Sequence, residues 1–220
     1  MFFTFGSNAY AQDAPVVVEL FTSQSCSSCP PADRVLGELA QKDNVIVLSC
    51  HVTYWNHLHW EDTLSRKFCT DRQRDYARVK GKRGAYTPQA VINGDTETVG
   101  SRRGHVNKLV DTATPIQKID ISPDQNALNI TLPDLKDDDY KLLLFTFGGG
   151  HTQSIPSGEN RGRTVTYTNP VSDLDNLGRW NGDTQIKTHK LGFGSAPSGG
   201  YAVIAQDRQG IIHAAGQLKL

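Results

Sequence analysis

Two cysteines, Cys26 and Cys29, are separated by two serines in the stretch FTSQSCSSCPPAD, residues 21–33, which continues with two prolines and an acid. A C-x-x-C pair can carry out thiol–disulfide exchange, can supply half of a metal site, or can form an inert disulfide that holds a turn. The choice between these depends on the elements that hold the two sulfur atoms.

A buried strand and a helix are predicted on either side of the pair. Residues 14–21, APVVVELF, are apolar and rich in β-branched side chains, which is typical of a strand covered on both faces. Residues 31–42 place apolar side chains at helical spacing after a proline, and residues 44–52, NVIVLSCHV, predict a second buried strand. The expected order is strand, C-x-x-C, helix, strand, which forms a right-handed βαβ unit.

This position favours redox chemistry for the pair. Cys26 would lie where the first N–H groups of a helix are unpaired and the helix dipole is positive, an environment that increases the thiolate fraction of a cysteine. Cys29, one turn later, would be the more buried thiol and would resolve a mixed disulfide. The predicted activity is thiol–disulfide exchange on protein or small-molecule thiol or disulfide substrates, without a cofactor.

Two domains are predicted along the chain. An aromatic and histidine-rich loop at residues 53–63 leads to a helix at residues 64–80, and short strands and a helix complete an α/β domain over residues 12–114. After Thr114 the segments are short, often alternate apolar and polar, and are separated by Gly, Pro, Asn and Asp. This pattern predicts an all-β, sandwich-like domain over residues 115–220.

Composition and the N-terminus narrow the class further. Lys plus Arg and Asp plus Glu both number 23, and no basic stripe stands out, so no nucleic-acid partner is expected. No apolar run reaches the roughly 18 residues of a membrane span. The start MFFTFGSNAYAQDAP carries an Ala-x-Ala pattern before a polar linker, which predicts a signal-peptide remnant over residues 1–11 and a periplasmic or secreted protein.

The other two cysteines, Cys50 and Cys69, fall in the second predicted strand and in the following helix. Four cysteines in an exported protein allow three connectivities, and two free buried thiols are the alternative. We favour Cys26–Cys29 together with Cys50–Cys69, because a bridge from strand to helix would stabilise the fold by about 3 kcal/mol.

A copper or zinc site is one alternative use of Cys26 and Cys29, since thiolate and imidazole suit both metals and His51 begins a histidine-rich loop. In the simpler interpretation, His51 packs beside the cysteine pair, and Trp55 lines the wall of a pocket that binds substrate. A third alternative is a non-catalytic binding protein in which the Cys26–Cys29 disulfide is structural.

The most polar motif of the second half is SGENRGRTVTYTN, residues 157–169, with Arg161, Arg163 and Asn169. Loop Asn and Arg side chains commonly stabilise turns, so this motif predicts a hydrogen-bonded corner between the domains. A binding edge is the alternative.

Several motifs together resemble a known family. They are ELFTSQSCSSCPPAD, HVTYWNHLHWED, RQRDYA, YTPQAVING, SGENRGRTVTYTNPV and LGRWNG. The first hundred residues resemble the thioredoxin superfamily, and nearly the whole chain resembles a bacterial family of secreted thioredoxin-like proteins of unknown function. The resemblance implies a thioredoxin-like first domain in which Pro88 forms a cis bond and packs against the cysteine pair. It also implies that Thr87 offers its backbone to the substrate.

The resemblance also implies a buried acid on the first strand that assists proton transfer. The candidate is Glu19, which lies seven residues before Cys26, whereas thioredoxins place their acid six residues before the first cysteine. Glu19 would serve as a general base if a β-bulge restores the register. Otherwise it is an exposed carboxylate at a strand end or the partner of an arginine.

Overall fold

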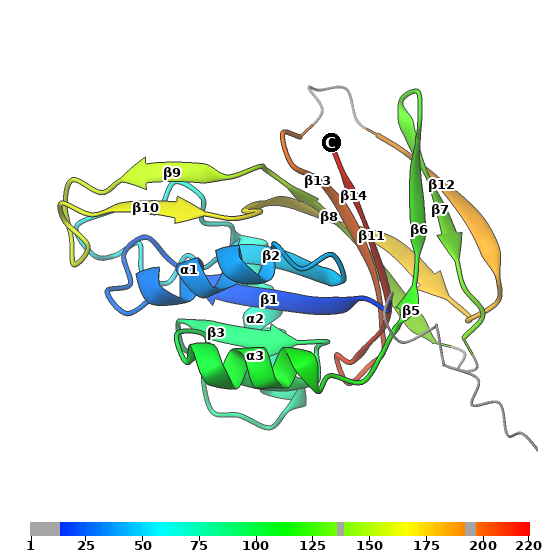
Figure 1. Ribbon diagram of the computed structural model, residues 1–220, viewed down its shortest axis with the longest axis horizontal. Helices are drawn as coiled ribbons and strands as arrows, with labels where there is room; N and C mark the ends of the chain where they lie inside the picture. The colour runs from blue at the N-terminus through cyan, green and yellow to red at the C-terminus, as the bar shows by residue number, and fades with distance from the viewer. Residues whose placement is uncertain (1–13, 136–138, 192–196) are drawn as a thin grey trace, which may run out of the picture.

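The computed structural model describes residues 14–135, 139–191 and 197–220. Within these ranges the protein is predominantly β-sheet, with fourteen strands and three helices (Figure 1). None of these helices combines the length and the apolar character that crossing a membrane requires. The predicted signal-peptide remnant, residues 1–11, lies outside the described residues.

The first half forms a four-stranded sheet in the order β2-β1-β3-β4. Strands β1 and β2 run parallel, whereas β3 lies antiparallel to both β1 and β4. The strands are β1 (Val16–Thr22), β2 (Val45–His51), β3 (Gln89–Ile92) and β4 (Thr96–Val99), and the helices are α1 (Pro30–Leu39), α2 (Lys67–Val79) and α3 (Arg103–Asp111). The expected strand–helix–strand order at the N-terminus is thus β1, α1 and β2.

The two faces of β1 contact different helices because side chains alternate along a strand. Val18 and Leu20 pack with apolar side chains of α1 and α3. Phe21 points to the other face, where it packs with Cys69 and Tyr76 of α2. Helices therefore cover both faces of the sheet, and every residue of β1 is buried.

The second half is all β. A five-stranded sheet has the order β11-β8-β13-β14-β5, a three-stranded sheet has the order β12-β7-β6, and β9 and β10 pair only with each other. The bounds are β5 (Gln117–Lys118), β6 (Asp120–Asp124), β7 (Ala127–Leu132), β8 (Tyr140–Phe147), β9 (His151–Ser154), β10 (Thr164–Tyr167), β11 (Val171–Trp180), β12 (Gln185–Lys190), β13 (Gly200–Gln206) and β14 (Ile212–Lys219). This β-rich arrangement is compatible with a second, β-type domain.

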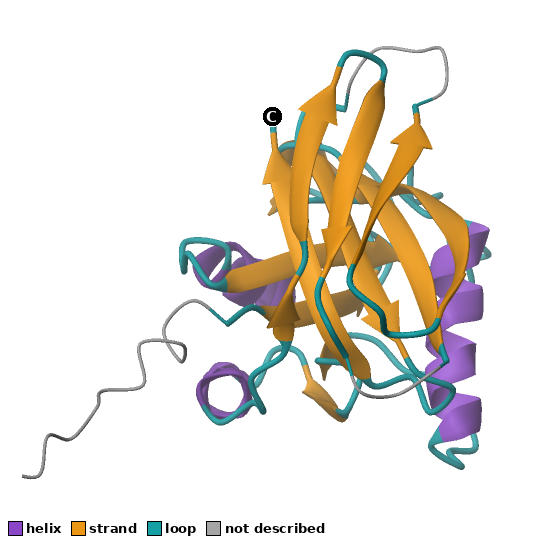
Figure 2. Cartoon of the chain, turned by 90° about the vertical axis from the view of Figure 1, so that its right-hand side faces the viewer, coloured by secondary structure: helices purple, strands orange, loops and turns teal. Residues whose placement is uncertain are grey.

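The five-stranded sheet is covered on both faces. One face packs against the three-stranded sheet through side chains such as Ile130 and Val203. Figure 2, turned by 90° from Figure 1, shows the strands of the β-rich half in layers. The other face packs against the first sheet, where Val17 and Leu48 meet Phe145. The two halves therefore share an apolar interface, and the predicted boundary near Thr114 lies between α3 and β5.

The β9–β10 hairpin extends away from the rest of the second half and lies beside α1 (Figure 1). The contact is close, because a Cβ placed on Gly37 of α1 would lie 3.2 Å from the Thr168 hydroxyl just after β10. The second half thus reaches the helix that follows the cysteine pair.

Candidate thiol–disulfide site

The cysteine pair lies in the turn between β1 and α1. Thr22 ends β1, and Cys29 is the residue before the first turn of α1, which begins with two prolines whose missing N–H groups cost nothing there. Cys26 and Cys29 form a disulfide with their Cα atoms 5.4 Å apart. The sulfur atoms therefore lie at the positive end of the α1 dipole, as the sequence predicted.

Asp33 is buried one helical turn after Cys29. Residues four apart lie on one face of a helix, so the Asp33 carboxyl group is on the same side of α1 as the Cys29 side chain. The Thr22 hydroxyl donates a hydrogen bond to Asp33 Oδ1 at 2.9 Å, and Oδ2 has no partner among the described residues. Burial raises the pKa of Asp33 to about 7, although His51 and Thr22 oppose this rise. A group with this pKa can accept or donate a proton near neutral pH.

His51 and Asp62 form a buried pair beside Asp33. His51 ends β2 directly opposite Thr22 of β1, and its Nδ1 lies 2.7 Å from Asp62 Oδ2. Burial alone would raise the pKa of Asp62, but His51 and the backbone N–H groups of Gln24 and Leu64 lower it overall. Asp62 is therefore the acceptor and His51 Nδ1 the donor. His51 Nε2 is buried without a partner among the described residues.

Tyr167 of β10 covers this pair from the second half. Its ring meets the His51 ring edge-on at 4.7 Å between centroids. Burial raises the pKa of Tyr167 well above its usual value, and the nearby acids Asp33 and Asp62 raise it further. The carboxyl ends of β1 and β2 thus hold a closed group of ionisable side chains, to which both halves contribute.

Thr87, Pro88 and Trp55, the predicted substrate-binding residues, lie together. Trp55 Nε1 donates a hydrogen bond to the Thr87 hydroxyl at 2.7 Å, and the Thr87–Pro88 peptide bond is cis. Gly100 brings Pro88 next to α1, because a Cβ placed on Gly100 would lie 3.1 Å from Ala32 Cβ and 3.6 Å from Pro88 Cβ. The structure thus places Pro88 close to the first turn of α1.

The β-bulge on which the general-base role of Glu19 depends is absent, and Glu19 is instead the partner of an arginine, the alternative that the sequence left open. The β1–β2 pairing runs without a register shift, so there is no bulge to turn Glu19 toward α1. Its side chain points to the α2 face, where Arg72 forms an ion pair with it and the Tyr76 hydroxyl donates to Oε1 at 2.6 Å. Arg72 also donates to Gln206 of β13 at 3.0 Å. Glu19 therefore holds α2 to the central strand and to the second half.

Cys50 of β2 and Cys69 of α2 form the second disulfide, with their Cα atoms 5.3 Å apart. It is buried with Phe21 and Val91 and fastens α2 to the sheet. No cysteine of the described ranges is free. The described residues contain no cluster of three or more His, Cys, Asp or Glu side chains suited to a metal ion.

The polar motif of residues 157–169 contacts the cysteine turn directly. The Asn160 side chain donates to the carbonyl oxygens of Gln24 and Cys26, both at 2.8 Å, and Arg163 donates to Ser27 at 3.3 Å. Asn169 donates to the Val47 carbonyl at 3.1 Å. The motif is a corner between the halves, as predicted, but its central residue is Asn160. Sequence reasoning missed both Asn160 and Asp33.

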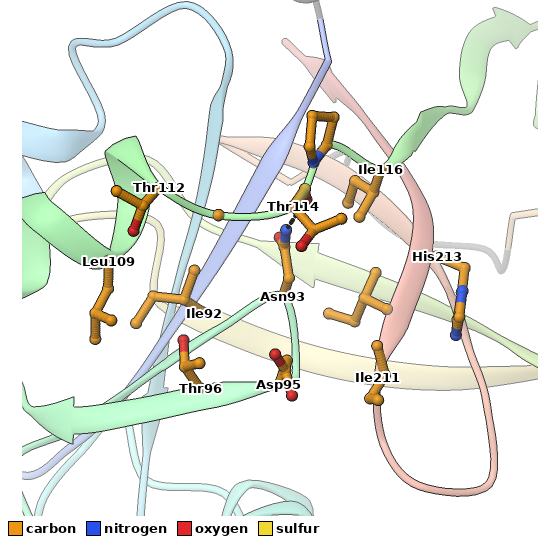
Figure 3. A pocket seen from close by; sticks show the side chains of 13 residues that line it. Ile92, Asn93, Asp95, Thr96, Leu109, Thr112, Thr114, Ile116, Ile211 and His213 are labelled. Carbon is orange, nitrogen blue, oxygen red and sulfur yellow. Dashed lines mark hydrogen bonds between the residues drawn. The ribbon is translucent and has the colours of Figure 1, made fainter.

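A separate cavity of about 370 Å³ lies at the opposite end of β1 (Figure 3). Asn93 projects into it and donates to the Thr114 carbonyl at 3.0 Å, while its Oδ1 accepts the N–H of Val17 at 2.8 Å. Val17 lies near the start of β1, whereas the cysteine turn follows its end. This cavity is therefore distinct from the thiol–disulfide site.

Comparisons with known proteins match the chain to one protein family and to two solved structures. Residues 17–206 match the family described as "Protein of unknown function (DUF1223)". The crystal structure of protein AGR_C_4864 from Agrobacterium tumefaciens is similar, with 30% sequence identity and a TM-score of 0.78 over 95% of this chain and 96% of that one. HBP35 of Porphyromonas gingivalis shares the fold, with 15% identity and a TM-score of 0.64 over 96% of this chain and 76% of that one. No curated protein matches the chain.

Proposed function

Because the chain belongs to the DUF1223 family, whose description assigns no activity, we propose its function from its own geometry: an exported thiol–disulfide oxidoreductase that uses Cys26 and Cys29. The first half is interpreted as thioredoxin-like. The order of β1, α1 and β2, the helices on both faces of the sheet and the position of Pro88 beside α1 support this interpretation. Two disulfides are compatible with an oxidising compartment, the periplasm or the extracellular space.

The observation that carries the proposal is the cysteine pair at the start of α1 with the buried Asp33 carboxyl group one turn later. A purely structural disulfide needs no proton acceptor near its sulfur atoms. A resolving thiol does need one, because only the thiolate attacks a disulfide. A carboxyl group with a pKa of about 7 suits this task at neutral pH.

The exchange takes place in two steps. In the reduced protein, the Cys26 thiolate attacks one sulfur of a substrate disulfide, whose S–S bond breaks and whose other sulfur leaves as a thiolate. The Asp33 carboxylate then accepts the proton of the Cys29 thiol, and the Cys29 thiolate attacks Cys26 Sγ. The second substrate sulfur leaves and the Cys26–Cys29 disulfide forms. Two electrons pass from the protein dithiol to the substrate disulfide, and the reverse sequence oxidises a substrate dithiol.

Turnover of a peptide disulfide by the full chain, with dithiothreitol as the reductant, tests the proposal. Cys26→Ser should lower turnover at least about a hundredfold, because the attacking sulfur is lost. Ser27→Ala is the matched control, since Ser27 lies between the cysteines, is exposed and supplies no sulfur. Turnover by Cys26→Ser equal to that of Ser27→Ala would exclude the oxidoreductase.

A further inference from the structure

The two sulfur atoms of the proposed site are not open to a partner. Cys26 is 2% exposed and Cys29 is fully buried, although the two serines between them are exposed. Thiol–disulfide exchange requires an attacking sulfur to reach a disulfide sulfur directly, and reactive cysteines are usually partly exposed. Something must therefore move before the pair can react.

The cover comes from the second half of the chain. The loop that joins β9 to β10, residues 155–163, lies over the cysteine turn, and Asn160 at its centre is 1% exposed. Asn160 Nδ2 bridges the carbonyl oxygens of Gln24 and Cys26, and Arg163 links Asn160 Oδ1, at 3.0 Å, to the Ser27 carbonyl. The loop is thus held to the cysteine turn by side chains and not by a β-ladder.

The same loop also contacts the aromatic loop of residues 53–63. The Ser157 hydroxyl donates to the His59 carbonyl at 2.6 Å. Gly158, with φ at +76°, lies against Trp60, and a Cβ there would lie 3.3 Å from Trp60 Cβ. Trp60 Nε1 in turn donates to the Gln24 side chain at 2.8 Å. Three segments that are distant in sequence, the cysteine turn, the aromatic loop and the loop of residues 155–163, therefore meet beside the pair.

The connection of this loop to the rest of the fold permits movement. The strands β9 and β10 pair only with each other, so the loop between them can shift without breaking the larger sheets. Gly158 and Gly162, with φ at +76° and +80°, adopt left-handed backbone conformations that glycine allows in tight turns.

We propose that residues 155–163 form a lid over the Cys26–Cys29 pair, and that Asn160 is the positioning residue that keeps the lid closed. This inference rests on the proposed function, for which it supplies the access step. The apparent reactivity of the pair equals the reactivity of the open form multiplied by the fraction of molecules that are open. The lid therefore protects the pair from free thiols until it opens.

Reduction of the oxidised full chain by dithiothreitol tests the lid. In this reaction dithiothreitol is oxidised to its cyclic disulfide, and Cys26 and Cys29 become thiols, which are alkylated and counted by peptide mass spectrometry. Asn160→Ala should speed this reduction roughly tenfold or more, the factor expected from losing one to two hydrogen bonds. Arg163→Ala should have a smaller effect in the same direction, because its contact with Ser27 is longer and exposed.

Two controls separate opening of the lid from general loosening. Thr152→Ala removes an exposed hydrogen bond to Thr166 in the same hairpin, away from the cysteine turn, and should leave the rate within about twofold. The buried Cys50–Cys69 disulfide is an internal reference whose reduction rate should not change. An unchanged or slower rate in Asn160→Ala, or equal acceleration of both disulfides, would overturn the lid.

The proposed function fails in a different measurement. Suppose that neither the wild-type chain nor Asn160→Ala turns over peptide disulfides, while Asn160→Ala still speeds reduction of Cys26–Cys29. This result would support the lid and contradict the oxidoreductase. If turnover is present and Asn160→Ala leaves the reduction rate of Cys26–Cys29 unchanged, the result would support the oxidoreductase and contradict the lid.

Discussion

Replacing Asp33 with asparagine should make the protein increasingly more stable than the wild type as the pH rises. The side chain keeps its shape and can still accept the Thr22 hydrogen bond, but it no longer carries a buried charge. The rise in the Asp33 pKa from 3.8 to about 7 corresponds to about 4 kcal/mol of destabilisation once the carboxyl group is ionised in both the folded and the unfolded state.

The sign follows from proton binding. Because the folded state has the higher pKa, the stability contributed by protonated Asp33 is fully present below about pH 3.8 and is lost as the pH rises through about 7. The asparagine variant has no such loss. Between about pH 5 and about pH 8.5, its stability relative to the wild type should therefore increase by about 2–3 kcal/mol. Any cost of the new amide group does not depend on pH and cancels in this difference.

Urea unfolding under non-reducing conditions, followed by circular dichroism at several pH values, measures this difference. Asp43→Asn, which changes an exposed carboxyl group in the loop after α1, is the matched control and should stay within about 0.5 kcal/mol of the wild type throughout. A stability difference between Asp33→Asn and the wild type that does not change with pH would refute the raised pKa and, with it, the proton-acceptor role.

Three further predictions concern groups around the site. Glu19→Gln should lower the unfolding free energy by about 3–5 kcal/mol in urea titrations, because Arg72 is left as a buried unpaired charge. Turnover per folded molecule should stay unchanged, and a selective loss of turnover would support the general-base role instead. Replacing both Cys50 and Cys69 with alanine should lower the unfolding free energy by about 3 kcal/mol in the same assay and leave turnover unchanged. Loss of turnover in the folded variant would instead indicate that this disulfide relays electrons. Asp62→Asn should destabilise the fold by about 1–3 kcal/mol, since His51 Nδ1 and two backbone N–H groups lose a charged acceptor. An unchanged urea midpoint of unfolding would contradict the buried His51–Asp62 pair.

The local elements around the cysteines could be predicted from the sequence, because each depends on short-range patterns. The apolar run of β1, the prolines that open α1 and the second apolar run of β2 placed the pair correctly at a helix start. Pro88 and Thr87 were placed near it by resemblance. Asp33 was missed although its spacing of four from Cys29 was visible, since an acid in a helix is usually exposed.

The errors and omissions concern contacts between distant segments. Glu19 belongs to the face of β1 that α2 covers, and only the three-dimensional path of the chain decides which helix covers which face. Asn160 contacts Cys26 across 134 positions of sequence, a distance over which no local periodicity applies. Likewise β13 is buried along its whole length because the three-stranded sheet covers one face of its sheet and the first sheet covers the other. The sequence suggested a sandwich there, with no sign of the shared interface.

The reduction potential of the Cys26–Cys29 pair tests the central claim most directly. Equilibration of the full chain with defined dithiothreitol or glutathione ratios, followed by alkylation and mass spectrometry, gives this value and that of Cys50–Cys69 in one experiment. A redox-active pair should fall in the range of known catalytic pairs, from about −120 to about −270 mV, with Cys50–Cys69 below about −300 mV. A Cys26–Cys29 potential that is also below about −300 mV would identify a structural disulfide and contradict the proposed function.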